Sequence, residues 1–246
     1  MARVKFEIEK NGRKFLVFPS KEEAISFAGQ RTVELLLTAR REGSSRLSLA
    51  LSGGSAAESY FASIRQQNRF PWSQTEIFQV DERLVPRDSP DSNGRLIDQY
   101  LGETEARLHL VRTELGALQA AEIFRHELIE IFQKSKKNGF SLVVLGLGID
   151  GHTASLFPGQ ERELTSQEAV LITESPEKPS ARISLGIEPI NNSDNIIAIV
   201  VGDKKSNIIK RLFNNNQRDP ALPFSYLQKK NIEIILDQDA GQEITP

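Results

Sequence analysis

Three polar segments of the sequence contain residue types that could carry out chemistry, and each follows an apolar run. They are the Ser52-Gly53-Gly54-Ser55 loop after Arg46–Leu51, the Asp81-Glu82-Arg83 triplet after Glu76–Val80, and the stretch Gly146–Pro158 after Ser141–Leu145. Apolar runs of this length predict buried strands, and ligands of parallel sheets sit outside the carboxyl ends of strands. We therefore expect the three segments to contribute to one site.

The third segment carries the sharpest candidate for a catalytic group, His152. An imidazole has an ordinary pKa of about 6.5, so it can accept a proton at neutral pH. Asp150 precedes it by two residues and could orient the ring or raise its basicity, although this spacing also fits a local cap. The other histidines, His109 and His126, are predicted to be structural or solvent-facing.

The glycine-rich loop Ser52–Ser55 could hold an anion, because glycines allow close backbone approach and a helix is predicted to start just after them. A plain tight turn fits the same residues equally well. The loop is not a Walker A motif, since no Gly-Lys-Ser/Thr follows it. Gly146-x-Gly148-x-x-Gly151 matches a dinucleotide pattern, but His152–Pro158 does not resemble the start of a long crossover helix, which argues against that function.

Charged residues elsewhere are candidates for binding an anion. Arg83 could contact an anionic or carbonyl oxygen, and Asp81 could contact hydroxyls or orient a partner. A solvated strand end with a local Asp81–Arg83 pair is the alternative. Arg182 begins one predicted strand and the Lys204-Lys205 pair follows another, although isolated charges are more often surface residues.

Several chemistries are disfavoured. The chain has no Cys, which removes disulfides, thiolate nucleophiles and thiolate metal sites. No second His or Cys lies at metal-ligand spacing from His152, so no metal is expected. Neither Ser55 nor Ser155 is followed by the last glycine of a G-x-S-x-G elbow, so a serine nucleophile is poorly supported.

The elements that must position these residues alternate between strands and helices. The segment Arg3–Phe18, with Asn11-Gly12 at its centre, predicts a hairpin. Further strands are predicted at Arg46–Leu51, Glu76–Val80, Ser141–Leu145, Ala169–Thr173, Ala181–Leu185, Asn195–Val201 and Asn231–Leu236. Helices are predicted from Ser20 to near Gly43, after Ser55 to about Gln67, and over Ser92–Leu101, Glu114–Phe132 and Lys204–Phe213.

This order predicts one α/β domain over residues 1–246. Its sheet should be doubly wound and largely parallel, with helices on both faces in a Rossmann-like arrangement and a short N-terminal hairpin. The composition is ordinary for a soluble protein, with 39% hydrophobic residues, 26% charged residues and a formal net charge of -2. We expect no nucleic-acid or membrane partner, and a cytoplasmic location follows by default because no signal pattern or membrane-spanning run is present.

The motifs together resemble those of the 6-phosphogluconolactonase family, which hydrolyses a lactone in the oxidative pentose phosphate pathway. The resemblance rests on Ser52–Ser55, Asp81-Glu82-Arg83-x-Val85-Pro86, Asp91–Asn93, Gly146–Gly159, Pro179–Leu185, Gly202-x-x-Lys205, Leu222-Pro223 and Ile235–Asp237. The segment around His152 is long and specific. Members commonly have Gly-Gly-Ser-Thr-Pro in the first loop, whereas Ala56-Ala57 follow Ser55 here, which puts substrate affinity in question more than chemistry.

The resemblance implies hydrolysis of 6-phospho-D-glucono-1,5-lactone to 6-phosphogluconate without a metal or organic cofactor. His152 would be the general base and Asp150 would hold its ring, with Arg83 or glycine-loop N–H groups facing the oxyanion. The remote phosphate would be held by Gly53, Gly54, Ser55, Arg182 and Lys205, and Asp81 would belong to the substrate site. The expected partner is this small sugar-phosphate lactone alone, bound by a monomer or weak oligomer.

Two other functions stay open. Glucosamine-6-phosphate deaminases/isomerases share a Gly-Gly-Ser loop and an Asp-Gly-His motif. They usually have Ile-Ala-Phe-Asn-Glu-Pro after the histidine and Asp-Glu-Tyr at the second motif, where this chain has Thr153–Pro158 and Asp81–Arg83. A non-catalytic sugar-phosphate-binding protein could keep the fold and the loop, but retention of both Asp150 and His152 argues against it.

Overall fold

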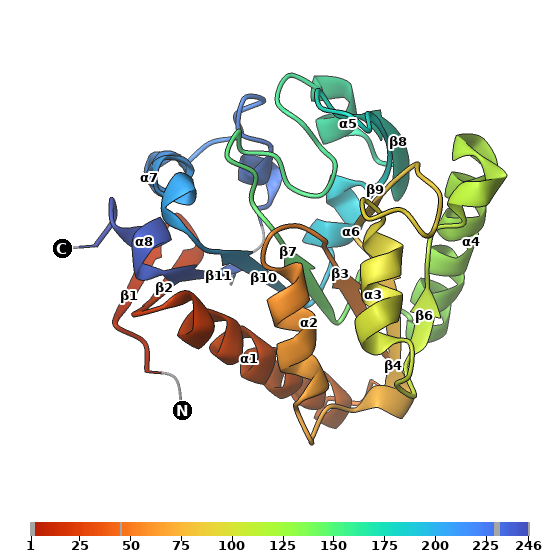
Figure 1. Ribbon diagram of the computed structural model, residues 1–246, viewed down its shortest axis with the longest axis horizontal. Coiled ribbons are helices and arrows are strands. Elements are labelled where there is room, and N and C mark those ends of the chain that lie inside the picture. Colours follow the sequence, from red (N-terminus) through yellow and green to blue (C-terminus); the bar gives the residue numbers. More distant parts are fainter. Residues whose placement is uncertain (1–2, 45, 229–231, 246) are drawn as a thin grey trace.

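A computed structural model describes residues 3–44, 46–228 and 232–245, which form a long twisted sheet between two layers of helices (Figure 1). The strands are β1 (Phe6–Lys10), β2 (Arg13–Phe18), β3 (Leu47–Leu51), β4 (Thr75–Gln79), β5 (Asp81–Arg83), β6 (Arg107–His109), β7 (Leu142–Leu145), β8 (Val170–Glu174), β9 (Ala181–Leu185), β10 (Asn195–Val200) and β11 (Ile232–Asp237). The α-helices are α1 (Lys21–Arg41), α2 (Ala57–Arg65), α3 (Asn93–Leu101), α4 (Ala117–Ser135), α5 (Glu161–Thr165), α6 (Ile187–Asn191), α7 (Ser206–Asn214) and α8 (Gln238–Gly241). Short 3₁₀ helices lie at Trp72–Gln74, Thr113–Leu115, Asp203–Lys205 and Pro223–Tyr226.

The main sheet has the strand order β1-β2-β11-β10-β7-β3-β4-β6. Every neighbouring pair in it is parallel except β1 and β2, which form the antiparallel hairpin. The central strand β7 is buried at all four positions, as expected for a parallel strand that is covered on both faces. The predicted α/β fold with an N-terminal hairpin is therefore confirmed.

Two hydrophobic layers cover the sheet. Helices α1, α2 and α3 pack on one face through residues such as Leu36, Phe61 and Ile97. Helices α4, α6 and α7 pack on the other face, with Phe124 and Leu212 among their buried residues. Figure 1 shows these helices on the two sides of the strands.

A second, three-stranded antiparallel sheet has the order β5-β9-β8. The strands predicted at Ala169–Thr173 and Ala181–Leu185 are present, but they belong to this separate sheet. Only a short turn region joins them, and antiparallel pairing needs no crossover helix. The triplet Asp81–Arg83, expected as the polar end of a strand, also forms a short strand of this sheet.

Smaller differences concern the ends of elements. The three-residue strand β6 was not predicted, because Arg107–His109 is too short and polar to give an apolar pattern. The last strand begins at Ile232, and Asn231, its predicted first residue, lies outside the described residues. No helix in the described part of the chain combines the length and apolar character needed to cross a membrane.

Candidate functional site

The carboxyl ends of β3, β7 and β10 open onto one cavity of about 270 Å³. The residues around it include Ser52–Ser55, Asp81, Arg83, Asn93, His152 and Lys205. Parallel strands end at the same edge of a sheet, so segments that are far apart in the sequence meet there. The three polar segments expected to contribute to one site are brought together in this way.

His152 lines the cavity and forms a hydrogen-bonded pair with Asp150. The ring Nδ1 lies 2.6 Å from Asp150 Oδ1, and the backbone N–H of His152 donates to the same oxygen at 3.1 Å. The Phe157 ring packs against the imidazole with its centroid 4.8 Å away. Nε2 has no hydrogen-bond partner among the residues that the structure describes, so this nitrogen can take a proton.

The charge state of Asp150 suits a residue that orients a histidine. Burial alone would raise the pKa of this carboxyl, but its hydrogen bond to His152 and the charge of that ring outweigh burial, so the pKa lies below its usual value. The side chains of both residues remain more than a third exposed, at 38% for Asp150 and 35% for His152. Asp150 therefore stays an acceptor that holds Nδ1–H and leaves Nε2 unprotonated when the ring is neutral.

Glycines allow this pair to form. A Cβ on Gly148 would collide with His152 Nδ1 and Asp150 Oδ1, so only glycine fits beneath the pair. Gly151 has a φ of 96°, which favours glycine, and the Gly148 N–H donates to the His152 carbonyl at 2.8 Å to close the loop. Thr153 Oγ1 donates to the Gly146 carbonyl at 3.1 Å and ties the loop back to the end of β7.

The glycine loop Ser52–Ser55 leads into α2. The cap position of this helix is Ala56, whose side chain offers no hydrogen bond to the first turn. The unpaired N–H groups of a helix start therefore receive no acceptor from the cap side chain, which suits an anion at this point. A Cβ on Gly53 would collide with Asn93 Oδ1, so this glycine allows α3 to start against the loop.

Asp81 and Arg83 line the cavity without pairing with each other in the described residues. Arg83 donates through a guanidinium NH₂ group to the Asp91 carbonyl at 2.7 Å. Asp81 Oδ2 accepts a hydrogen bond from Ser155 Oγ at 2.6 Å. The interpretation of this triplet as a local Asp–Arg pair is therefore not what the geometry shows.

The two later basic residues differ in position. Lys205 lines the cavity, and its Nζ donates to the Leu147 carbonyl at 2.5 Å. Burial lowers the pKa of this amine, while the charge of Asp150 opposes that effect.

Arg182 is buried and pairs across strands with Arg83. Its guanidinium donates to the Pro179 and Ala181 carbonyls. Burial, then the charge of Arg83, lowers the Arg182 pKa. Arg182 is not among the residues that line the cavity.

Glu82 is a buried residue behind the cavity wall that sequence reasoning gave no separate role. Its carboxylate accepts from Ser92 Oγ at 3.0 Å and from the backbone N–H groups of Asn93 and Gly94 at 2.8 and 2.7 Å. It thereby holds the start of α3 beside Asp81 and the glycine loop. The only hint in the sequence is a third charge between Asp81 and Arg83, because its partners lie about ten residues away.

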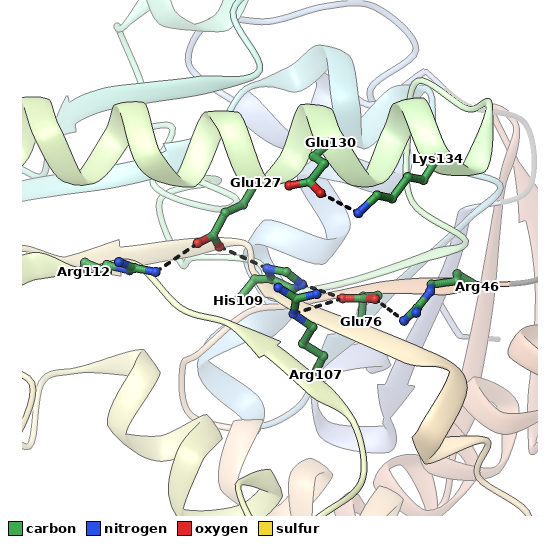
Figure 2. Close-up of polar contacts among 8 residues, drawn as sticks. All are labelled: Arg46, Glu76, Arg107, His109, Arg112, Glu127, Glu130 and Lys134. Atoms are coloured by element: carbon green, nitrogen blue, oxygen red, sulfur yellow. Dashed lines mark hydrogen bonds and ion pairs between the residues drawn. The ribbon is translucent and has the colours of Figure 1, made fainter.

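His109 belongs to a different environment, away from the cavity. Its Nε2 lies 2.6 Å from Glu76 Oε2 and its Nδ1 lies 3.0 Å from Glu127 Oε2, with Arg46 and Arg112 on the outer oxygens (Figure 2). The ring is 5% exposed and stacks on Phe78 at a centroid distance of 4.3 Å. His109 is thus structural, whereas His126 is exposed on α4.

Comparisons with known proteins agree with this geometry. The sequence model of the family described as "Glucosamine-6-phosphate isomerases/6-phosphogluconolactonase" matches residues 19–236. The 6-phosphogluconolactonase of Synechocystis is 31% identical over 80% of this chain and 85% of its own length. The human GDH/6PGL endoplasmic bifunctional protein is 34% identical over 92% of this chain, which spans only 30% of that longer protein. The crystal structure of a 6-phosphogluconolactonase from Shewanella baltica superposes with a TM-score of 0.78, at 26% identity, over 91% of this chain and 97% of its own. The chain therefore belongs to the glucosamine-6-phosphate isomerase/6-phosphogluconolactonase family, as its motifs predicted.

Proposed function

We propose that the protein hydrolyses 6-phospho-D-glucono-1,5-lactone to 6-phosphogluconate. The observation that carries the proposal is the His152–Asp150 pair at a cavity that also holds Lys205, Arg83 and a helix start. The names of the relatives support the substrate. The reaction is a step of the oxidative pentose phosphate pathway, and this pathway and a cytoplasmic location are part of the proposal. The single-domain organisation and a monomeric or weakly oligomeric state also stay predictions.

In the proposed mechanism, His152 Nε2 removes a proton from a water molecule as the water oxygen attacks the lactone carbonyl. Asp150 keeps the other proton on Nδ1 and stabilises the imidazolium that forms. The tetrahedral intermediate then collapses, and the bond between the carbonyl carbon and the ring oxygen breaks. The imidazolium returns its proton to that ring oxygen, which becomes a hydroxyl. No metal or organic cofactor takes part in this scheme.

The remaining residues stabilise charge in the proposal. Arg83 or N–H groups of the Ser52–Ser55 loop face the oxyanion, and the same loop with Lys205 holds the phosphate. Arg182 does not reach the cavity wall, so its contribution is positive potential behind Arg83 rather than direct contact. Binding energy at the phosphate positions the carbonyl for attack.

The test measures hydrolysis of the lactone above its spontaneous rate. The reaction is monitored through the release of protons in a weakly buffered solution. The His152→Ala variant should lose about 10²- to 10⁴-fold in kcat, the usual contribution of a general base. His126→Ala, an exposed histidine, is the matched control and should keep the wild-type rate. A wild-type rate in His152→Ala would exclude this residue as the base.

Two further substrates distinguish the alternatives. Turnover of glucosamine-6-phosphate without lactone hydrolysis would assign the chain to the other activity of its family. Binding of sugar phosphates without turnover of either substrate would indicate a binding protein.

The phosphate site is tested by comparing the phosphorylated and unphosphorylated lactones. Equal kcat/KM for the two would exclude Lys205 and the glycine loop from phosphate binding.

A further inference from the structure

Ser155 is held in place through every polar group it has. Its hydroxyl donates to Asp81 Oδ2 at 2.6 Å, and its side chain is buried. Its backbone N–H donates to Ser184 Oγ at 3.1 Å, and its carbonyl accepts from Thr173 Oγ1 at 2.7 Å. Three segments of the second sheet, on β5, β8 and β9, therefore meet at this one residue.

Asp81 has acceptor capacity left after this contact. Asn93 Nδ2 donates to the Asp81 backbone carbonyl at 2.9 Å and lies 3.5 Å from Oδ1, at the limit of a hydrogen bond. Within the described residues, no Lys or Arg forms an ion pair with this carboxylate. An ionised carboxylate has about four lone-pair sites, so Asp81, which lines the cavity, can still accept from hydroxyl groups.

From this geometry we infer that Ser155 is a positioning residue, which holds Asp81 in the orientation that binds the sugar hydroxyls of the substrate. The inference rests on the proposed lactonase function and adds a residue to it. A lone carboxylate at a strand end has several side-chain rotamers. A buried hydroxyl on Oδ2 selects one of them and leaves Oδ1 for the ligand.

The position of Ser155 in the chain strengthens the inference. It lies three residues after His152, and Ala154 between them has a φ of 52°, an uncommon conformation for a residue other than glycine. Such a conformation persists where the surroundings hold the backbone firmly. The base and the residue that orients Asp81 therefore belong to one firmly held segment, which fixes the distance between the reacting end and the hydroxyl contacts of the substrate.

The principal variant is Ser155→Ala. It should raise KM for the lactone roughly tenfold while kcat changes by less than about threefold, because a hydrogen bond to a charged group is lost and the base is untouched. Thr173→Val is the matched control, since it removes a hydrogen bond to Ser155 but not the contact with Asp81. Its KM should rise much less than that of Ser155→Ala, because the backbone contact with Ser184 still holds Ser155. If the alanine variant does not fold, Ser155→Cys takes its place. Cysteine is similar in size to serine but a weak hydrogen-bond donor, so a rise in KM is expected for it too.

A double-mutant cycle shows whether Ser155 acts through Asp81. In an Asp81→Asn background, Ser155→Ala should cause little further change in KM. A full additional loss in that background would overturn the inference, and so would equal losses in Ser155→Ala and Thr173→Val. Both outcomes would make Ser155 a structural residue only.

Calorimetric binding separates this inference from the proposed function. Ser155→Ala should weaken binding of 6-phosphogluconate roughly tenfold and leave binding of inorganic phosphate unchanged, because only the first probe has hydroxyls for Asp81. If the wild-type protein binds 6-phosphogluconate but does not hydrolyse the lactone, the proposed function is wrong. The binding of the two probes by Ser155→Ala can still be compared with that of the wild type. Equal weakening for both probes, or no weakening, would contradict the role of Ser155.

Discussion

Two histidines of this protein contact carboxylates at similar distances, yet their surroundings are opposite. His152 contacts one carboxylate, Asp150, at 2.6 Å through Nδ1, and its ring is 35% exposed at a cavity. His109 contacts Glu76 at 2.6 Å and Glu127 at 3.0 Å through its two nitrogens, and it is 5% exposed (Figure 2). Sequence spacing alone does not reveal this difference.

The number of occupied ring nitrogens separates a reactive histidine from a structural one. Carboxylates only accept, so both contacts of His109 are hydrogen bonds when both nitrogens carry protons, and neither nitrogen is left for a substrate. His152 uses one nitrogen in its contact with Asp150, and the other, which has no partner among the described residues, is the one that the proposed function assigns to proton transfer. A carboxylate partner is therefore a weak sign of catalysis, and a free second nitrogen beside a cavity is a stronger one.

The largest expected effect is loss of stability on changing the structural histidine. His109→Ala should lower the free energy of unfolding by about 3–5 kcal/mol, because it removes a buried ring that stacks on Phe78 and takes a hydrogen-bond partner from the buried Glu76. His126→Ala on α4 is the control and should change it by no more than about 0.5 kcal/mol. Urea denaturation measures both. A large loss of kcat/KM per folded molecule in His109→Ala would break the comparison, since this residue should not affect chemistry.

An intermediate effect is expected from the glycine beneath the reactive pair. Gly148→Ala should lower kcat about 10²-fold, because the added Cβ would collide with His152 and Asp150 and displace them by about an ångström. Ile149→Ala, at an exposed residue of the same loop that does not line the cavity, is the control, and most of the activity should remain. Steady-state rates on the lactone measure both variants. Equal losses would show that the loop backbone, rather than the His152–Asp150 geometry, is sensitive.

The smallest effect concerns pH and Lys205, the lysine that lines the cavity. Because the pKa of Lys205 lies below its ordinary value, its charge is lost at a lower pH than that of an exposed lysine. Affinity for 6-phosphogluconate should therefore fall as the pH rises through that lowered value, by roughly fivefold in all. In Lys205→Arg the fall in affinity should occur only at higher pH, because the guanidinium group stays protonated there. Lys204→Arg, an exposed neighbour, should leave the pH profile of calorimetric binding unchanged, and a shift there would assign the effect to general surface charge.

Much of the fold could be predicted because its signals are local. Asn11-Gly12 predicts the hairpin turn, and both residues have positive φ angles, 55° and 73°. The apolar run Leu142–Leu145 predicts a buried strand, and all four of its residues are buried. Strand ends meet at one edge of a parallel sheet, so convergence of the three polar segments followed from the fold class.

The parts that could not be predicted depend on contacts between distant residues. Nothing near Asp81 in the sequence indicates that Ser155 donates to it from 74 positions away. The pairing of Arg83 with Arg182 follows from the second sheet, which an alternating pattern of strands and helices does not reveal. The role of the Ser155 hydroxyl can be recognised only from the structure, in which β8 and β9 hold this residue against Asp81.

The position of β11 in the main sheet has a consequence for the order in which the chain folds. This strand pairs with β2 on one side and β10 on the other, so within the described parts of the chain residues 13–18 join the rest of the sheet through residues 232–237 alone. A chain that emerges from the ribosome N-terminus first cannot attach its first hairpin until the last strand has been made. Such pairing between distant segments also slows folding. The inner strands β10, β7, β3 and β4, which bear the cavity, are neighbours of one another without β11 between them, so that late step completes the sheet outside the cavity.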